Sequence, residues 1–148
     1  MEILRTDSSN RDFIYLVGWL DKELAERDGD DHVFYAQFNK IVSIKNVIVV
    51  YEGEKPVACG AIKAFDEQSM EVKRMFTLPE YRGKGLASMV LKALETWAKE
   101  SGYTKCVLET GKRQPEAIAL YEKNGYTVTA NYGQYIGIEN SVCFEKFL

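Results

Sequence analysis

A glycine-containing turn between a strand-like run and a helix-like run constrains the fold of this chain most strongly. Residues 78–87 read Leu-Pro-Glu-Tyr-Arg-Gly-Lys-Gly-Leu-Ala, between an apolar run at Met70–Thr77 and an amphipathic run at Leu86–Glu100. The first N–H groups of a helix point outward unpaired, and the helix dipole adds partial positive charge there. Glycine allows close backbone approach, and Arg82 and Lys84 add positive charge. The turn therefore predicts a site for a phosphate-bearing ligand.

The rest of the pattern predicts an α/β domain with a mixed sheet. β-Branched and apolar runs indicate strands, and apolar residues that recur every three or four positions indicate helices. Strands are expected at Glu2–Arg5, Asn46–Tyr51, Lys55–Phe65, Met70–Thr77, Lys105–Glu109, Thr127–Tyr132 and Val142–Phe147. Helices are expected at Phe13–Leu24, at Val33–Asn39, at Leu86–Glu100 with an apolar stripe of Leu86, Val90, Leu94 and Trp97, and from Pro115 to Asn124.

The connections predict how these strands pair. Turns at 52–54 and 66–69 join three strands into an antiparallel meander. A helix joins Met70–Thr77 to Lys105–Glu109, so these two strands should be parallel with a right-handed crossover. The last two strands should pair antiparallel. Ligands of such sheets tend to bind at the C-terminal ends of parallel strands, where the glycine turn lies.

Length and composition narrow the class of protein. A chain of 148 residues fits one domain with a sizeable core, taken as residues 1–148. The net charge of −3 argues against a general nucleic-acid surface. The chain lacks an apolar run of membrane-spanning length, and its first residues lack the apolar core of a signal peptide. We therefore expect neither nucleic acid nor membrane as a partner, and a cytoplasmic location.

The cysteines and the one histidine restrict the chemistry. Cys59, Cys106 and Cys143 lie in apolar, strand-like runs without a CxxC pair, which predicts buried, reduced thiols. A single histidine, His32, excludes a multi-histidine metal site, and we expect no metal. A Ser-His-Asp triad would have to use His32, whose two neighbouring aspartates favour an exposed or helix-start role instead.

The spacing of the glycine turn differs from two common nucleotide loops and resembles another motif. A P-loop needs GxxxxGK followed by Ser or Thr, and a dinucleotide loop needs GxGxxG, where this chain has Ser88 in place of the third glycine. The run Arg82–Ala87 resembles the Arg/Gln-x-x-Gly-x-Gly/Ala motif of the GNAT-type N-acetyltransferase superfamily.

A second segment extends this resemblance. The run Gln114–Tyr126 is similar to the family's Asn-x-x-Ala-x-x-Leu-Tyr-x-x-x-Gly-Phe segment, with Gln114 in place of Asn and Tyr126 in place of Phe. The order of expected strands also matches, so the resemblance covers nearly the whole chain. It implies the acyl-CoA N-acyltransferase fold, an α/β fold with a mixed, mostly antiparallel central sheet, a parallel strand pair at the CoA site and flanking helices.

The resemblance implies acetyl-CoA as the cofactor and indicates which residues hold it. In the family the turn binds the pyrophosphate, and the end of the preceding strand pairs with the pantetheine arm through its backbone. The implied cofactor-binding residues are Met75, Phe76, Thr77, Arg82, Gly83, Lys84, Gly85, Leu86, Ala87 and Gln114.

Three residues are candidates for the chemistry. Acetyl transfer to an amine needs a base for the amine's proton and benefits from an acid for the leaving thiolate. Tyr121 is the candidate acid, because the family often uses the tyrosine of this Leu-Tyr pair; the alternative is a core tyrosine. Glu71, eleven positions before Arg82, matches the catalytic glutamate of histone-type members. Glu109 is the competing base or amine anchor, and both glutamates stay open to being solvated strand residues.

The identity of the acceptor is the part of the expected reaction that the sequence constrains least. By resemblance, Tyr35, Asn39, Tyr132 and Tyr135 are the residues expected to line its pocket. The leading hypothesis is an N-acetyltransferase that moves acetyl from acetyl-CoA to a primary amine of a small molecule, by direct attack in a ternary complex. The alternatives are acetylation of a protein N-terminus or lysine, and a non-catalytic acyl-CoA sensor. A peptide acceptor and a homodimer both stay open.

Overall fold

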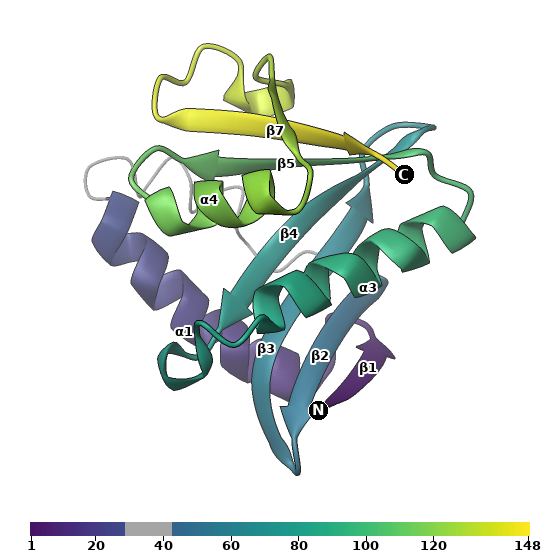
Figure 1. Cartoon of the computed structure of the whole chain (residues 1–148), viewed down its shortest axis with the longest axis vertical. Coiled ribbons are helices and arrows are strands. Elements are labelled where there is room, and N and C mark those ends of the chain that lie inside the picture. Colours follow the sequence, from purple (N-terminus) through teal and green to yellow (C-terminus); the bar gives the residue numbers. More distant parts are fainter. Residues whose placement is uncertain (29–42) are drawn as a thin grey trace.

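A mixed sheet of seven strands forms the centre of the computed structural model, which describes residues 1–28 and 43–148 (Figure 1). The strands are β1 (Glu2–Thr6), β2 (Asn46–Glu52), β3 (Lys55–Ala64), β4 (Ser69–Thr77), β5 (Lys105–Gly111), β6 (Thr127–Thr129) and β7 (Ser141–Phe147). Their order across the sheet is β1-β2-β3-β4-β5-β7-β6. All neighbours pair antiparallel except β4 and β5, which are parallel. The predicted α/β fold with a mostly antiparallel sheet and one parallel pair is therefore confirmed.

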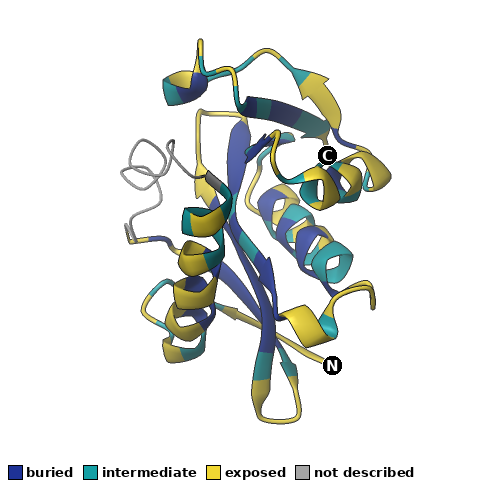
Figure 2. Cartoon of the chain, turned by 90° about the vertical axis from the view of Figure 1, so that its left-hand side faces the viewer, coloured by how far each residue is buried: buried dark blue, intermediate teal, exposed yellow. Residues whose placement is uncertain are grey.

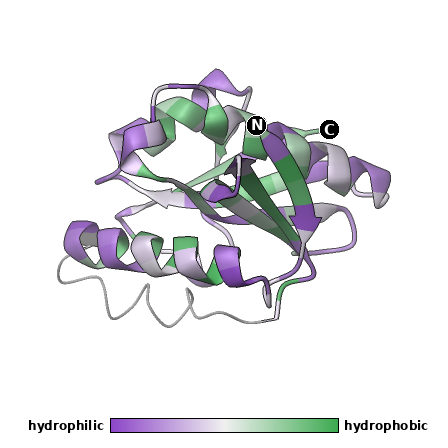
Figure 3. Cartoon of the chain, turned by 90° about the horizontal axis from the view of Figure 1, so that it is seen from below, coloured by the Kyte–Doolittle hydropathy of each residue, from purple (hydrophilic) through white to green (hydrophobic). Residues whose placement is uncertain are grey.

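Helices cover both faces of this sheet. The helix α1 (Arg11–Asp28) lies on one face, and α3 (Leu86–Glu100) and α4 (Pro115–Lys123) lie on the other (Figure 2). Two short 3-10 helices, η2 (Pro79–Tyr81) and η3 (Gly133–Tyr135), lie in the connections. The central strands are mostly hydrophobic, whereas α1 mixes hydrophobic and hydrophilic residues (Figure 3). The helices contribute Phe13, Leu16, Val17, Val90, Leu91 and Leu94 to the fully buried core.

Local sequence sets where the helices begin. Asn10 Oδ1 accepts the backbone N–H groups of Asp12 and Phe13 at 3.0 and 2.9 Å, which caps α1 at the predicted place. Pro115 is the first residue of α4, a position whose N–H would have no partner within the helix, so the missing N–H of proline costs no hydrogen bond. Gly85, with φ of 81°, precedes α3.

A bulge in β4 lies opposite Gly60 and re-aims the strand. The pairing register shifts between Cys59 and Ala61 on β3, and Arg74 on β4 has φ of 60°. A Cβ at Gly60 would come within 2.6 Å of Met75 Sδ, so a larger residue would push β3 against its neighbours. Bulges bend a strand and redirect its side chains, and this one lies in the β3–β4 pairing, just beyond Glu71, the last β4 residue that pairs with β5.

The strand predicted at Thr127–Tyr132 is too long. Only β6 (Thr127–Thr129) pairs with β7, because Asn131 bends the chain into a loop. Its Nδ2 donates to the carbonyl oxygens of Tyr135, Ile138 and Ser141 at 3.1, 3.1 and 3.2 Å.

The apolar stripe predicted for α3 packs against the core, with its C-terminal end less buried than the rest. Trp97 is half-buried, with the Arg5 guanidinium 4.8 Å from its ring centre, and Ala98 is the fully buried residue there. The three cysteines are buried and free, as expected. The predicted helix Val33–Asn39 lies outside the described residues. Within the described part of the chain, the helices are too short or too polar to cross a membrane.

Candidate active site

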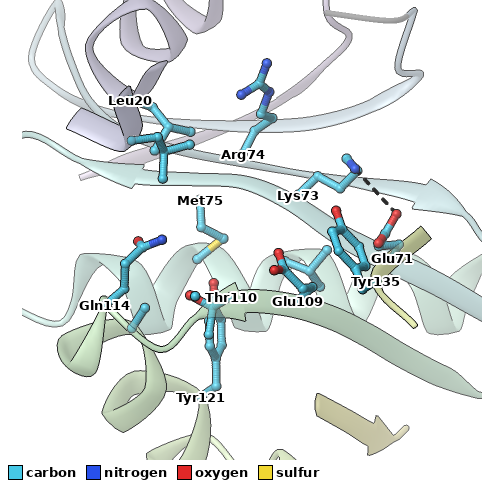
Figure 4. Close-up of a pocket in the computed structure, with 14 residues that line it drawn as sticks. Leu20, Glu71, Lys73, Arg74, Met75, Glu109, Thr110, Gln114, Tyr121 and Tyr135 are labelled. Atoms are coloured by element: carbon cyan, nitrogen blue, oxygen red, sulfur yellow. Dashed lines mark ion pairs between the residues drawn. The ribbon is translucent and has the colours of Figure 1, made fainter. Parts of the chain in front are cut away.

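The parallel strands β4 and β5 separate soon after they meet. They pair only at Ser69–Lys105, Met70–Cys106 and Glu71–Val107, although β4 continues to Thr77 and β5 to Gly111. Beyond Glu71, the edge of β4 that faces β5 therefore forms no ladder hydrogen bonds with β5. A cavity of about 130 Å³ lies in this gap (Figure 4). We call it the inner cavity, and it is lined by Leu20, Leu24, Glu71, Val72, Lys73, Arg74, Met75, Glu109, Thr110, Gly111, Gln114, Ala117, Tyr121 and Tyr135.

A second cavity, of about 430 Å³, runs from the inner cavity to the glycine turn. We call it the turn groove; its walls come from the end of β4, the start of α3, and parts of α1 and α4. The two cavities share five lining residues, Leu20, Met75, Gln114, Ala117 and Tyr121. A long ligand in the turn groove can therefore extend past Tyr121 into the gap between β4 and β5.

The glycine turn presents backbone N–H groups to the groove. Gly83 and Gly85 have φ of 77° and 81°, left-handed values that other residues rarely adopt. Among the described residues, no side chain caps the N-terminus of α3 at Gly85. The N–H groups of its first turn and its dipole are thus available to an anion, as a phosphate site requires.

Arg82 braces the turn. Its Nε donates to the Thr77 carbonyl oxygen at 2.9 Å, its Nη2 donates to Glu23 at 2.8 Å, and its guanidinium lies 5.5 Å from the Phe76 ring centre. Lys84 lies over the Tyr81 ring at 5.2 Å and outside the lining of the groove. Arg82 therefore ties the turn to β4 and α1, and Glu23 offsets part of its charge.

Two carboxylates line the inner cavity from neighbouring strands. Glu71 Oε2 accepts the Tyr132 hydroxyl at 2.6 Å, and Glu71 Oε1 lies 3.6 Å from Lys73 Nζ. Glu109 Oε2 accepts the Ser141 hydroxyl at 2.7 Å. The Glu71 side chain is 11% exposed. Both carboxylates therefore have hydrogen-bond partners and still line a recess.

Tyr121 lies where the two cavities meet. Its ring packs against Tyr126 and Phe144, at centroid distances of 5.9 and 6.1 Å. Burial, and then the charge of Glu109, raise the pKa of Tyr121 above its usual range. The hydroxyl is therefore protonated at neutral pH and can act as a proton donor. The ring is part of the core, as the alternative interpretation expected, and the residue also lines both cavities.

The loop between β6 and β7 closes one end of the inner cavity. Tyr135, on η3, is 4% exposed, and its pKa is raised by burial and by the charges of Glu109 and Glu71. Burial and the charge of Glu71 likewise raise the pKa of Tyr132. Tyr132 also packs on Phe65 and Tyr135. Both tyrosines stay protonated hydrogen-bond donors beside the carboxylates.

The structure brings together most residues that the sequence pointed to. The inner cavity includes Glu71, Met75, Glu109, Gln114, Tyr121 and Tyr135. The turn groove includes Met75, Phe76, Thr77, Arg82, Gly83, Gly85, Leu86, Ala87, Gln114 and Tyr121. Tyr35 and Asn39 lie outside the described residues. Sequence reasoning missed Lys73 and Arg74 as cavity residues, since their placement depends on the bulge and the strand separation, which have no local signal.

Comparison with known proteins places this geometry in a family. The sequence model of the acetyltransferase (GNAT) family matches residues 10–126. The IAA acetyltransferase of Azospirillum brasilense is 38% identical over 91 residues, which span 61% of this chain and 60% of that protein. The uncharacterized N-acetyltransferase YjgM of Escherichia coli K12 is 43% identical over 82 residues, which span 53% of this chain and 48% of that protein. The chain thus matches about half to three fifths of the length of these two relatives.

Solved structures agree across the whole chain. A protein assigned as an acyl-CoA N-acyltransferase from Klebsiella pneumoniae has a TM-score of 0.83 and 28% identity, covering 99% of this chain and 97% of its own. A GNAT family acetyltransferase from Elizabethkingia anophelis with acetyl-CoA bound has a TM-score of 0.70 and 16% identity, with the same coverage, and shows the shared fold. The separated parallel strands, the glycine turn and the family match over residues 10–126 all agree, and the chain belongs to the acetyltransferase (GNAT) family.

Proposed function

We propose that this protein transfers an acetyl group from acetyl-CoA to a primary amine of a small molecule. The observation that carries the proposal is the continuous path from the glycine turn, past Tyr121, to the carboxylates Glu71 and Glu109. It joins an anion-binding backbone to a proton donor and two candidate bases. A cytoplasmic location is part of the same proposal.

The residues of the turn groove fit the donor. The N–H groups at the start of α3 would hold the pyrophosphate, and the β5-facing edge of β4 at Met75–Thr77 would pair with the pantetheine arm. Gln114 lines both cavities and offers an amide to the same arm. When bound, acetyl-CoA supplies the acetyl group as a thioester, which an amine can attack with release of the thiol.

Glu71 and Glu109 are the groups that would deprotonate the acceptor. A free alkylammonium has a pKa near ~10, so most of it is protonated and unreactive at neutral pH. A carboxylate in the recess attracts this cation and accepts its proton directly or through water. Either glutamate fits the role of base, and the other would then anchor the amine.

Tyr121 would give a proton to the departing thiolate. Its raised pKa keeps the hydroxyl protonated, and its place where the cavities meet is where a thioester would sit between turn and carboxylates. The nitrogen of the alkylammonium must lose two protons to become an amide. A glutamate takes the first before attack and releases it to solvent, and the second leaves as the tetrahedral intermediate collapses and replaces the proton that Tyr121 gives to sulfur.

The recess favours a small acceptor over a protein surface. Glu71 and Tyr135 are largely buried, so a reacting amine must enter the inner cavity to reach them. A small molecule does this without opening the fold.

An assay of thiol release from acetyl-CoA against a panel of amines and peptides tests the proposal. We expect release with at least one small amine and formation of the matching acetamide by mass spectrometry. Tight binding of CoA by calorimetry, with no release across the panel, would reassign the protein to the acyl-CoA sensors.

A further inference from the structure

A row of alternating charges lines the turn groove between the glycine turn, α1 and α4. Glu23 Oε2 accepts Arg82 Nη2 at 2.8 Å, and Glu23 Oε1 lies 3.6 Å from Arg27 Nη2. Arg27 Nη1 donates in turn to Glu116 Oε1 on α4. All four side chains belong to residues that line the turn groove. Ion pairs therefore run along the wall of the groove that would hold the donor.

These ion pairs join elements from opposite faces of the sheet. The helices α1 and α4 lie on opposite faces (Figure 2), and the C-terminal end of α1 and the N-terminal end of α4 come together at one side of the molecule (Figure 1). They can meet there because β4 and β5 separate beyond Glu71. Arg27 and Glu116 thus face the groove from opposite walls.

Glu23 occupies the position of an anion between two guanidinium groups. One of its carboxylate oxygens faces Arg82, and the other faces Arg27. The side chains of Glu23, Arg27 and Arg82 are 28%, 30% and 40% exposed, so they are open to solvent at the groove. Guanidinium groups bind phosphate through the same paired N–H groups that bind carboxylate. A phosphoryl group can therefore take the place of the Glu23 carboxylate.

We propose that Arg27 binds the pyrophosphate of the donor together with Arg82, and that Glu23 holds both arginines until the pyrophosphate displaces it. The inference rests on the proposed function, and it specifies the donor site. The pyrophosphate carries a charge on each phosphoryl group and is bound as well by the N–H groups at the start of α3, so it outcompetes one carboxylate. Glu23 then competes with the spent CoA and favours its release.

The direction of the effect at Glu23 separates this role from a structural one. Glu23→Gln should bind CoA more tightly, because both arginines are released and a negative charge leaves the groove. If Glu23 only braced Arg82 and the turn, the same variant would bind CoA less tightly. We expect the Kd of CoA to fall about three- to ten-fold, less than a buried charge pair gives, because these side chains are partly exposed.

Calorimetry with CoA measures this binding without an acceptor and without transfer. Arg27→Gln should raise the Kd of CoA about three- to ten-fold, and Arg27→Lys, which keeps the charge but loses the fork, should raise it less. The matched controls come from the exposed ion pair of Arg5 and Glu100, 2.8 Å apart and outside both cavities. Arg5→Gln and Glu100→Gln should leave the Kd of CoA within about two-fold, because salt screens distant charges.

A double variant tests whether Glu23 and Arg27 act on the same anion. Residues in contact are coupled, so the gain from Glu23→Gln should shrink by about half or more in the Arg27→Gln background, where only Arg82 is left to release. Dephospho-CoA, which lacks the ribose phosphate but keeps the pyrophosphate, should show the same changes in Kd as CoA. Loss of these changes with dephospho-CoA would overturn the assignment to the pyrophosphate.

The outcomes separate the two proposals. Weaker or unchanged binding of CoA in Glu23→Gln overturns the inference and leaves the proposed function standing. An equal gain from Glu23→Gln with and without Arg27 overturns the role of Arg27. Binding of CoA with the expected changes, but no transfer to any amine, overturns the proposed function alone. Absence of CoA binding in the unmodified protein overturns both.

Discussion

The turn groove and the inner cavity are built by different means. The anion-binding end of the turn groove depends on one contiguous segment whose backbone conformation, set by Gly83 and Gly85, exposes N–H groups, whereas α1 and α4 supply other walls. The inner cavity depends on side chains from β4, β5, α4 and the β6–β7 loop, held by their partners. A backbone site tolerates side-chain changes but not changes of conformation, whereas a side-chain site shows the reverse. Substitutions in the turn groove, the donor end of the site, should therefore change the KM of acetyl-CoA. Substitutions in the inner cavity, the acceptor end, should change kcat or the KM of the amine.

The largest expected effect is at the carboxylates of the inner cavity. Replacing the true base with glutamine should lower kcat by about a hundred-fold or more, the range of lost general-base catalysis. Glu71→Gln and Glu109→Gln are compared in pH–rate profiles at saturating acetyl-CoA. The variant that lacks the base should lose the acidic limb of its profile, whereas the variant that lacks an anchor should keep that limb and raise the KM of the amine.

The matched control for these variants is Glu95→Gln. Glu95 accepts Tyr126 and Lys146 at 2.8 Å each and lies outside both cavities. It should lower the melting temperature and leave the pH profile unchanged. If both Glu71→Gln and Glu109→Gln kept the pH–rate profile of the wild type, neither glutamate would be the base, and the proposed mechanism would be contradicted.

Tyr121→Phe should give the next largest effect, a loss of about ten-fold or more in kcat. The raised pKa keeps the hydroxyl protonated well above pH ~10, the usual value for tyrosine, so this residue should cause no loss of wild-type activity below that pH. Turnover is measured with an activated thioester and with acetyl-CoA; the deficit should be smaller with the donor whose thiolate leaves more easily.

Tyr126→Phe is its control, because these rings pack together but Tyr126 lines neither cavity. Tyr126 donates to Glu95 at 2.8 Å, so its loss should cost about 1 kcal/mol of stability with little effect on kcat. Equal turnover in Tyr121→Phe and wild type would leave Tyr121 a core residue only.

At the turn groove, a change of backbone should act on the donor alone. Gly85→Ala places a side chain at φ of 81°, where strain of about 1–2 kcal/mol favours another conformation of the turn. We expect the KM of acetyl-CoA to rise about three- to ten-fold and the KM of the amine to stay unchanged. Gly125→Ala is the control, because Gly125 has φ of 89° after α4 and lies outside the groove. This variant should lower the stability of the fold without changing either KM. A change in the KM of the amine in Gly85→Ala would show that the turn groove and the inner cavity do not act independently.

The same contrast explains what the sequence could predict. The glycine turn was predictable because its signal is local: glycine spacing, a preceding strand and an amphipathic helix lie within one segment. The fold followed from similarly local patterns, including the parallel pairing across α3. Tyr121 and Glu71 were proposed from the resemblance and Glu109 from its position at the end of a strand, and the structure places all three in the lining of the inner cavity.

The partners within the inner cavity were not predictable, because they depend on contacts distant in sequence. Tyr132 reaches Glu71 across 61 positions, and Ser141 reaches Glu109 across 32. The bulge at Arg74 needs the register of β3, and no local residue type marks it. Asn131, which sets the loop of Tyr132, sits in a run whose alternation is typical of a strand.

Asn131→Ala should give the smallest effect, confined to the acceptor end. One amide nitrogen holds three carbonyl oxygens of the β6–β7 loop, so its loss frees the segment that carries Tyr132 and Tyr135. We expect a stability loss of about 1–2 kcal/mol and a rise of about three-fold in the KM of the amine, because the loop must be ordered again on binding. The matched control is Asn124→Ala, whose Nδ2 donates to Ser88 and Leu120 beside the turn groove. It should cost similar stability and shift only the KM of acetyl-CoA. If both variants changed the same KM, the two ends would not be separable, because one cooperative unit would order them together.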